Sequence, residues 1–198
     1  MRIGVFGGTF DPPHIGHQIL ADECLHQLNL DKVLWVLTFV PPHKTGQKIS
    51  SLEQRLAMVQ AAISDRDEFV LSRVDIDRPA PHYAVETVRI LRQQYPNSAL
   101  VYLMGGDSLR DLPHWHTPRE FVRECDEIGV MRRPNDTIDL AMVQNEIPEI
   151  STKLSWIEAP LIDIASHEIR RRAKIRLPIR YYLPGRVYQL IWENNWYQ

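Results

Sequence analysis

Short apolar runs of strand length alternate along this chain with longer segments of helical periodicity, about six times in all. The links between them are short, and no internal repeat or linker interrupts the order. Such alternation is typical of an α/β fold with a doubly wound, mostly parallel sheet, whose ligands bind at the carboxyl ends of the strands. We expect strands at residues 2–6, 33–40, 69–71, 99–104, 128–131 and 154–157.

The helical segments carry apolar residues at spacings of three and four, and several open on capping residues. Ser51 and Gln54 form a capping box before one of them, and Thr117 with Pro118 is a typical start of another. The secondary structure of residues 135–153 and 174–185 is ambiguous from the sequence. We expect a single domain over residues 1–198, with helices at 15–28, 52–63, 84–95, 166–173, from 118 onward and after 185.

Composition excludes several classes of protein. The 198 residues are 44% hydrophobic and 24% charged, which is typical of a globular chain rather than a disordered one. A formal charge of −2 provides no global field for nucleic acid or an anionic membrane, so an anionic ligand needs a local cluster of donors. Cys24 and Cys125 are too few for a disulfide framework, and we expect a cytoplasmic protein without leader or membrane span.

The string GGTFDPPHIGH, residues 7–17, follows the first expected strand and is the strongest motif in the chain. Gly7 and Gly8 predict a tight turn whose backbone N–H groups can approach a phosphate, beside the positive end of a helix. His14 and His17 are neighbours on the first turn of that helix, and Gly16 leaves room for a ligand. Together these features predict a pocket for a polyphosphate, although the Walker and dinucleotide-binding glycine patterns are absent.

This string resembles the signature of the nucleotidylyltransferase superfamily, in the form found in bacterial nicotinate-nucleotide adenylyltransferases. The resemblance extends along nearly the whole chain, through residues 41–44, 83–87, 106–109, 115, 132–134 and 164–170. It implies a Rossmann-like nucleotidylyltransferase fold and the transfer of an adenylyl group from ATP to nicotinate mononucleotide, with release of pyrophosphate. The acceptor phosphate is already a nucleophile at neutral pH, so the protein needs chiefly to align two anions and neutralise charge.

The resemblance also implies roles for particular residues. His14, His17 and Arg170 would be catalytic, with His17 steadying the charge of the transition state. Arg170 lies on the same helical face as Ser166, a good N-cap, and residues 166–198 would complete the ATP site. The ATP-binding residues would be Gly7, Gly8, Thr9, Phe10, Gly106, Asp107, Arg133 and Ser166.

The mononucleotide would lie on the other side of the site. Lys44 provides a point charge for its phosphate, Trp115 a flat face for the pyridine ring, and Asp107 a carboxylate for ribose hydroxyls. Tyr83 and Thr87 would bracket backbone donors for the nicotinate carboxylate. His114, His116 and Cys125 do not predict a zinc site, because they lack a second paired ligand. The divalent metal that we expect is Mg²⁺, held mainly by ATP phosphates and water.

Some points stay open at the level of sequence. The family pattern I-S-S-T-x-I-R is altered here by Ala165 and His167, which removes two hydroxyl donors. The choice of nicotinate over nicotinamide mononucleotide rests on the resemblance alone, and phosphopantetheine is another candidate acceptor. Class I aminoacyl-tRNA synthetases share the HIGH tetrapeptide at residues 14–17 but carry a K-M-S-K-S-type loop that this chain lacks. A non-catalytic ATP-binding module and a homo-oligomer also remain open.

Overall fold

The computed structural model describes residues 1–39, 49–132 and 137–198. Its centre is a parallel six-stranded sheet in the order β3-β2-β1-β4-β5-β6. This order confirms the predicted doubly wound α/β fold. The strands are β1 (Arg2–Gly8), β2 (Lys32–Leu37), β3 (Phe69–Ser72), β4 (Ala99–Gly105), β5 (Glu127–Met131) and β6 (Leu154–Ile157).

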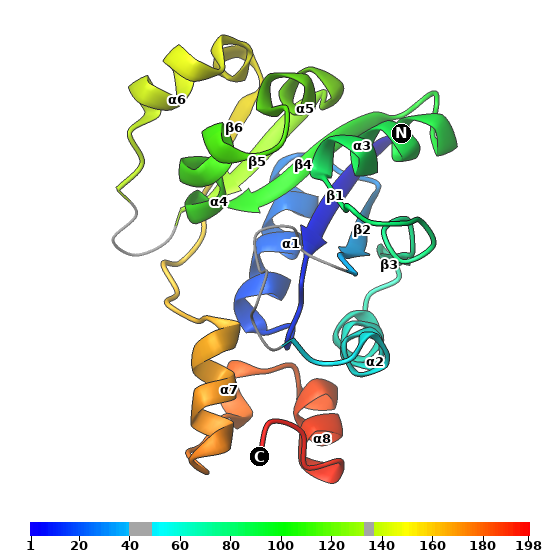
Figure 1. Ribbon diagram of the computed structural model, residues 1–198, viewed down its shortest axis with the longest axis vertical. Helices are drawn as coiled ribbons and strands as arrows, with labels where there is room; N and C mark the ends of the chain where they lie inside the picture. The colour runs from blue at the N-terminus through cyan, green and yellow to red at the C-terminus, as the bar shows by residue number, and fades with distance from the viewer. Residues whose placement is uncertain (40–48, 133–136) are drawn as a thin grey trace.

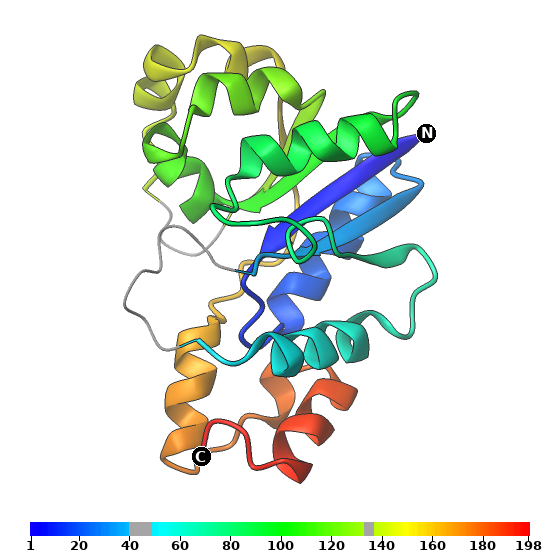
Figure 2. The same cartoon turned by 45° about the vertical axis from the view of Figure 1, so that its right-hand side comes forward.

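Helices cover both faces of the sheet, as Figures 1 and 2 show. One face packs against α1 (Ile15–Gln27) and α2 (Leu52–Ile63). The opposite face packs against α3 (Ala84–Gln94), α4 (Gly106–Asp111), α5 (Pro118–Glu124) and α6 (Leu140–Glu146), together with the short turns η2 (Leu112–His114) and η3 (Pro148–Thr152). Two hydrophobic cores therefore sandwich the strands.

Strand residues alternate between these two cores, as the two-residue period of a strand requires. In β2, Val33, Trp35 and Leu37 face α1 and α2, whereas Leu34 and Val36 face the opposite side. All of them are at most 1% exposed, which explains why the sequence of this strand is an unbroken apolar run. Burial of each such side chain contributes about 1.5–3 kcal/mol relative to exposure.

The last part of the chain folds beyond the carboxyl ends of the strands. β1 runs from the N-terminus toward α7 (Ser166–Lys174), η4 (Arg180–Tyr182) and α8 (Gly185–Glu193) in both views (Figures 1 and 2). Ile169 of α7 and Val187 and Ile191 of α8 join the same core as α1 and α2. The C-terminal helices thus lie where the strand ends present their loops.

Several expectations from sequence need correction. Gly7 and Gly8 do not form a turn but pair with Val36 and Leu37 inside the sheet. The short helices α4 and α6 were not predicted. Trp35 and Trp192 were both expected in the core, where tryptophans usually lie; Trp35 is buried, but the Trp192 side chain is 64% exposed. Within the described ranges, no helix is long and apolar enough to cross a membrane.

Candidate active site

The strand order reverses between β1 and β4, both of which pair in parallel with partners on either side. In open α/β sheets, ligands bind in the crevice at such a switch point, outside the carboxyl ends of the strands. The predicted motif begins at the end of β1, and Gly106 and Asp107 follow the end of β4 directly as the first turn of α4. The fold therefore brings these two predicted segments to one place.

The two glycines at the end of β1 make room for aromatic side chains. A Cβ atom at Gly7 would lie 2.7 Å from the hydroxyl oxygen of Tyr102, and one at Gly8 would lie 2.8 Å from the Phe10 ring. The chain turns after the glycines, where Phe10 adopts a left-handed φ of 47°. The glycines thus allow close packing within the sheet and the tight return of Phe10.

Phe10 was predicted among the ATP-binding residues, but its ring belongs to the core. The side chain is 2% exposed, and its ring lies 5.3 Å from Phe6 and 5.1 Å from Trp35, centroid to centroid. The same ring meets the His17 imidazole edge-to-face at 5.2 Å. Of Phe10, only the backbone can face a nucleotide, and its side chain instead supports His17.

His14 and His17 form a stacked pair at the start of α1. Their ring centroids are 3.6 Å apart with an interplanar angle of 24°. The backbone N–H of His14 donates to Nδ1 of His17 at 3.1 Å, so the neutral His17 ring carries its proton on Nε2. His17 can therefore present an N–H donor from Nε2. The His14 ring, which stacks on His17, is buried, since His14 is 2% exposed.

Gly16 has a different role from the one predicted. A Cβ atom at this position would lie 3.2 Å from Nδ1 and 3.3 Å from Cε1 of His14. The space was expected to hold a ligand, but the His14 imidazole occupies it. Gly16 thus permits the stacked arrangement of the two histidines.

α7 brings Arg170 and Ser166 to the same loop. Nη1 of Arg170 donates to the Asp11 carbonyl oxygen at 2.6 Å, and the Ser166 hydroxyl donates to the Pro12 carbonyl oxygen at 2.9 Å. Residues separated by more than 150 positions are joined in this way. The predicted meeting of the histidine motif with the C-terminal helix is thereby seen in the fold.

The prediction that Ser166 is the N-cap of this helix is wrong. The N-cap is Ala165, and Ser166 is the first helical residue. Ala165 has no polar side chain, so no side-chain cap covers the first amides of α7. Because the first N–H groups of a helix lack intrahelical partners, this end of α7 is suited to an anion.

Aromatic rings gather at the start of α3 and after η2. The Tyr83 ring stacks on His116 with centroids 3.9 Å apart and an interplanar angle of 18°. Trp115 is half-buried and packs against Phe121 at 5.2 Å and Tyr102 at 6.1 Å. Trp115 is thus held by aromatic contacts on one side and keeps part of its surface accessible.

Thr87 was predicted to help bind the mononucleotide, but its side chain is buried in a polar network. It is 3% exposed, and its hydroxyl donates to the buried Asp75 carboxylate at 2.7 Å. Arg78 donates to the same carboxylate at 2.9 Å and to the Pro81 carbonyl oxygen at 2.8 Å. The Thr87 side chain therefore anchors the loop before α3. The predicted contact of this segment with the mononucleotide uses backbone N–H groups and stays a prediction.

Sequence reasoning missed Asp75 and Arg78, which carry no motif and lie in a segment without periodicity. It also missed Arg55, which is 2% exposed on α2. Two predicted site residues, Lys44 and Arg133, lie outside the described residues. Arg132 is exposed, and its guanidinium lies 4.4 Å from the centre of the Trp156 ring.

The two cysteines do not take part in this site. Both are buried with free thiols, and burial raises the pKa of the Cys24 thiol to about 12. Burial raises the pKa of the Cys125 thiol as well. A protonated thiol is a poor nucleophile, so neither residue is suited to covalent catalysis.

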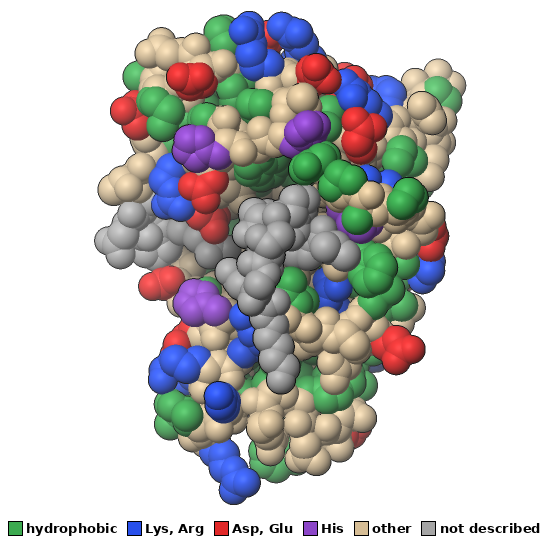
Figure 3. Space-filling view, viewed as in Figure 1, with side chains coloured by type: hydrophobic (Ala, Val, Ile, Leu, Met, Phe, Trp, Pro, Cys, Tyr) green, Lys and Arg blue, Asp and Glu red, His purple; other side chains and the backbone are tan. Residues whose placement is uncertain are grey.

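Side chains that could hold a metal ion are sparse around this crevice. Across residues 1–39, 49–132 and 137–198, no group of three or more His, Cys, Asp or Glu side chains is arranged to hold one. Figure 3 shows histidine and basic side chains at several places on this face, with acidic side chains among them. Histidine and basic side chains are donors suited to phosphate oxygens.

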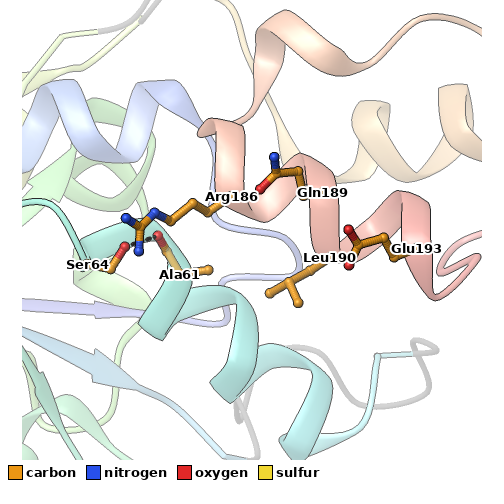
Figure 4. A pocket seen from close by; sticks show the side chains of 6 residues that line it. All are labelled: Ala61, Ser64, Arg186, Gln189, Leu190 and Glu193. Atoms are coloured by element: carbon orange, nitrogen blue, oxygen red, sulfur yellow. Dashed lines mark hydrogen bonds between the residues drawn. The ribbon is translucent and has the colours of Figure 1, made fainter.

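A separate hollow lies between α2 and α8. It is lined by Ala61, Ser64, Arg186, Gln189, Leu190 and Glu193. Figure 4 shows these side chains, with the Ser64 hydroxyl donating to the Ala61 carbonyl oxygen at 3.0 Å. None of the residues predicted to act on a nucleotide lines this hollow.

Known proteins are similar in sequence to this chain over its full length. The cytidylyltransferase-like family model matches residues 5–172. A Thermomicrobium roseum protein described as "Probable nicotinate-nucleotide adenylyltransferase" is 41% identical over 197 residues, covering 100% of this chain and 92% of the relative. A Bacillus subtilis protein described as "Nicotinate-nucleotide adenylyltransferase" is 34% identical over 197 residues, covering 100% of this chain and 98% of the relative.

Solved structures share the fold. The Plasmodium falciparum nicotinic acid mononucleotide adenylyltransferase complexed with NaAD superposes with a TM-score of 0.81 at 18% identity, covering 99% of this chain and 97% of that one. The same enzyme complexed with APC gives a TM-score of 0.79 at 19% identity, with 99% and 96% covered. At this identity the likeness establishes the architecture.

Proposed function

Because the chain belongs to the cytidylyltransferase-like family, and its full-length relatives are nicotinate-nucleotide adenylyltransferases, we propose that its crevice at β1 and β4 transfers an adenylyl group from ATP to nicotinate mononucleotide. The products are nicotinate adenine dinucleotide and pyrophosphate. The observation that carries this proposal is the convergence of the stacked His14–His17 pair with Arg170 of α7 on one loop at the switch point.

The reaction requires the alignment of its two substrates rather than a general base. A phosphate oxygen of the mononucleotide attacks the α-phosphorus of ATP, the bond from this phosphorus to the bridging oxygen breaks, and pyrophosphate leaves with the electron pair. Since the attacking phosphate is ionised at neutral pH, no side chain has to remove a proton. Holding the two anions in line can contribute about 7–11 kcal/mol toward the barrier.

The triphosphate would lie between β1 and α7. His17 can donate from Nε2 to the α- or β-phosphate, since its Nδ1 accepts the His14 backbone N–H. Arg170 is held by the Asp11 carbonyl through Nη1, and other N–H groups of its fork can take β- or γ-phosphate oxygens. This set of donors would be completed by Thr9, the backbone at Gly7 and Gly8, and the first amides of α7 beside Ser166.

The opposite wall would hold the mononucleotide. Trp115 offers a partly accessible ring face for the cationic pyridine ring, and the start of α3 after Tyr83 offers backbone donors for the carboxylate. Gly106 and Asp107, at the start of α4, would lie between the two substrates, where the carboxylate could accept hydrogen bonds from ribose hydroxyls. Lys44 and Arg133 are proposed for the phosphates from the sequence alone.

We propose that the divalent cation is Mg²⁺ and that it enters as part of the MgATP substrate, bound by phosphates and water. We also propose that residues 1–198 act as one domain, in which residues 166–198 complete the ATP site. The contacts of Ser166 and Arg170 with the loop after β1 support this. The free cysteines support a cytoplasmic location.

The test is an acceptor panel with the purified chain, ATP and Mg²⁺. Nicotinate mononucleotide, nicotinamide mononucleotide and phosphopantetheine are supplied in parallel, and pyrophosphate release is measured for each. We expect the highest kcat/KM with nicotinate mononucleotide. Release with phosphopantetheine alone would contradict the proposal. The absence of release with all three acceptors would also contradict it and would favour a non-catalytic ATP-binding module.

A further inference from the structure

A buried carboxylate joins the loop after β1 to three other parts of the chain. Asp11 is 3% exposed, and its Oδ2 accepts the backbone N–H of Ser50, just before α2, at 3.2 Å. Its Oδ1 accepts the phenol O–H of Tyr197 at 2.6 Å. Its carbonyl oxygen holds Arg170, whose Nη1 is also 3.9 Å from Oδ2. Asp11 lies in the predicted motif, but nothing in the reaction requires its carboxylate to touch a substrate.

Tyr197 reaches Asp11 because α8 ends in a Schellman motif. The N–H of Asn195 donates to the Trp192 carbonyl oxygen at 3.3 Å, and that of Trp196 donates to the Ile191 carbonyl oxygen at 3.0 Å. Asn195 takes the left-handed conformation that this motif needs, with a φ of 52°. The chain therefore reverses after α8 and returns residue 197 toward the sheet.

Tyr197 itself is held in an uncommon backbone conformation, with a φ of 67°. A non-glycine residue in this region carries strain that the surrounding contacts must offset. Its ring packs against the core below α1 and α2, and its hydroxyl meets Asp11 and, at 3.6 Å, the sulfur of Met58. Burial, followed by the Asp11 carboxylate, raises the pKa of the phenol, so the group remains a hydrogen-bond donor to Asp11.

Arg55 binds the same loop from the other side. Its guanidinium donates to the carbonyl oxygens of Thr9, Thr38 and Phe39 at 3.1, 2.8 and 2.9 Å, and its Nε donates to Ser50 at 3.2 Å. The loop between Thr9 and Asp11 is thus fixed by one buried cation and one buried carboxylate. The phenol of Tyr197 ties this arrangement to the segment after α8 through its hydrogen bond to the Asp11 carboxylate.

We propose that Tyr197 is a positioning residue for adenylyl transfer, which acts through Asp11 to set Arg170 and the start of α1 against the triphosphate. This inference rests on the proposed function. It assigns a role in the reaction to a residue outside the glycine–histidine motif and outside α7. Loss of the phenol oxygen should let the loop and Arg170 shift, and small displacements of aligned groups lower turnover strongly.

The experiment compares Tyr197→Phe with Tyr181→Phe, which makes the same chemical change at a tyrosine that is 88% exposed on η4. We expect Tyr197→Phe to lower kcat about tenfold, with KM for nicotinate mononucleotide unchanged within about twofold. Tyr181→Phe should keep the wild-type kcat. Circular dichroism at the assay temperature establishes that both variants are folded.

A double-mutant cycle with Arg170→Ala separates positioning from general stabilisation. If Tyr197 acts through Arg170, the Phe substitution should change kcat by less than about twofold in the Arg170→Ala background. If the fold-reductions in kcat of the two single variants multiply in the double variant, the proposal is overturned. A wild-type kcat for Tyr197→Phe would overturn it as well. Should Tyr197→Phe not fold, a wild-type kcat in Asp11→Asn would overturn it equally. A wild-type chain that releases no pyrophosphate contradicts the proposed function itself, whereas an active wild type with an equally active Tyr197→Phe contradicts only this inference.

Discussion

The His14 and His17 rings lie stacked at 3.6 Å because the side chain of His17 folds back to accept the backbone N–H of His14 at 3.1 Å. This contact leaves Nε2 of His17 as the donor toward the crevice. Phe10 supports the same ring from the core at 5.2 Å. The geometry of one proposed catalytic donor is therefore set by three residues of a single motif.

Replacement of His17 by alanine removes the donor that we propose for the developing phosphate charge. We expect His17→Ala to lower kcat at least about 10²-fold, because a donor that acts on transition-state charge has an effect of this size. Steady-state kinetics measure the effect, and thermal unfolding shows that folding is retained. His167→Ala, at an exposed position on α7, is the matched control and should remain fully active.

Gly16 tests whether the histidine pair must keep its place. Alanine would favour the helix by up to about 1 kcal/mol, but its Cβ would lie 3.2 Å from Nδ1 of His14. We expect Gly16→Ala to lower kcat several-fold while the free energy of unfolding changes by less than about 1 kcal/mol. Gly185→Ala provides the control, since no atom lies within 4 Å of the added Cβ. Equal kcat values for the two variants would contradict the role given to Gly16.

Trp115→Ala tests the assignment of the mononucleotide wall. Loss of the ring face should raise KM for nicotinate mononucleotide about tenfold and leave KM for ATP nearly unchanged. Both constants come from initial rates with the other substrate saturating. Trp192→Ala removes a ring that is 64% exposed on α8 and should change neither constant. Equal effects on the two KM values would mean that Trp115 has no stacking role.

Thr87 should matter for stability rather than for binding. Thr87→Val leaves the buried Asp75 carboxylate without the hydroxyl at 2.7 Å, which should lower the free energy of unfolding by about 1–3 kcal/mol. Thr87→Ser keeps the hydroxyl and should lose less. Urea unfolding measures both, and KM for either substrate should stay within about twofold of wild type. A large rise in KM with unchanged stability would restore Thr87 to the binding site.

Acid sensitivity should have a contribution from Glu149. Hydrogen bonds from Arg119, its own backbone N–H and Arg123 lower the pKa of this carboxyl from 4.5 to about 2. A pKa that is lower in the folded state stabilises the fold above the unfolded-state pKa, and this contribution is lost as the pH falls from about 4.5 to 2. Glu149→Gln should therefore flatten the fall in stability over that range, measured by urea unfolding at each pH. If Glu149→Gln leaves the pH dependence of stability unchanged, the ion pairs of Glu149 with Arg119 and Arg123 are too exposed to contribute.

The sheet could be predicted from sequence because each buried strand is an apolar run and each long helix repeats its apolar positions over several turns. The helices α4 and α6 have only six and seven residues, which is too short for a periodic pattern to emerge. Trp192 shows a related limit. A tryptophan in a helix looks like a core residue in sequence, but its exposure depends on which neighbours pack against the helix.

The site was predictable as far as its residues form one motif. His14, His17 and the segment from Ser166 to Arg170 follow from local spacing, and the topology brings them together. The roles of Gly7 and Gly16 depend on where Tyr102 and His14 place their side chains, which spacing does not reveal. Arg55 and Tyr197 were missed because their importance comes entirely from tertiary contacts with distant backbone and with Asp11.

The most direct test of the account is to measure the products formed from ATP and nicotinate mononucleotide by the purified wild-type chain and by His17→Ala and His167→Ala, with Mg²⁺ present. We predict that the wild type and His167→Ala form nicotinate adenine dinucleotide and pyrophosphate in equal amounts, and that His17→Ala forms them at a rate at least about 10²-fold lower. No dinucleotide from the wild type, or a wild-type rate from His17→Ala, would contradict it.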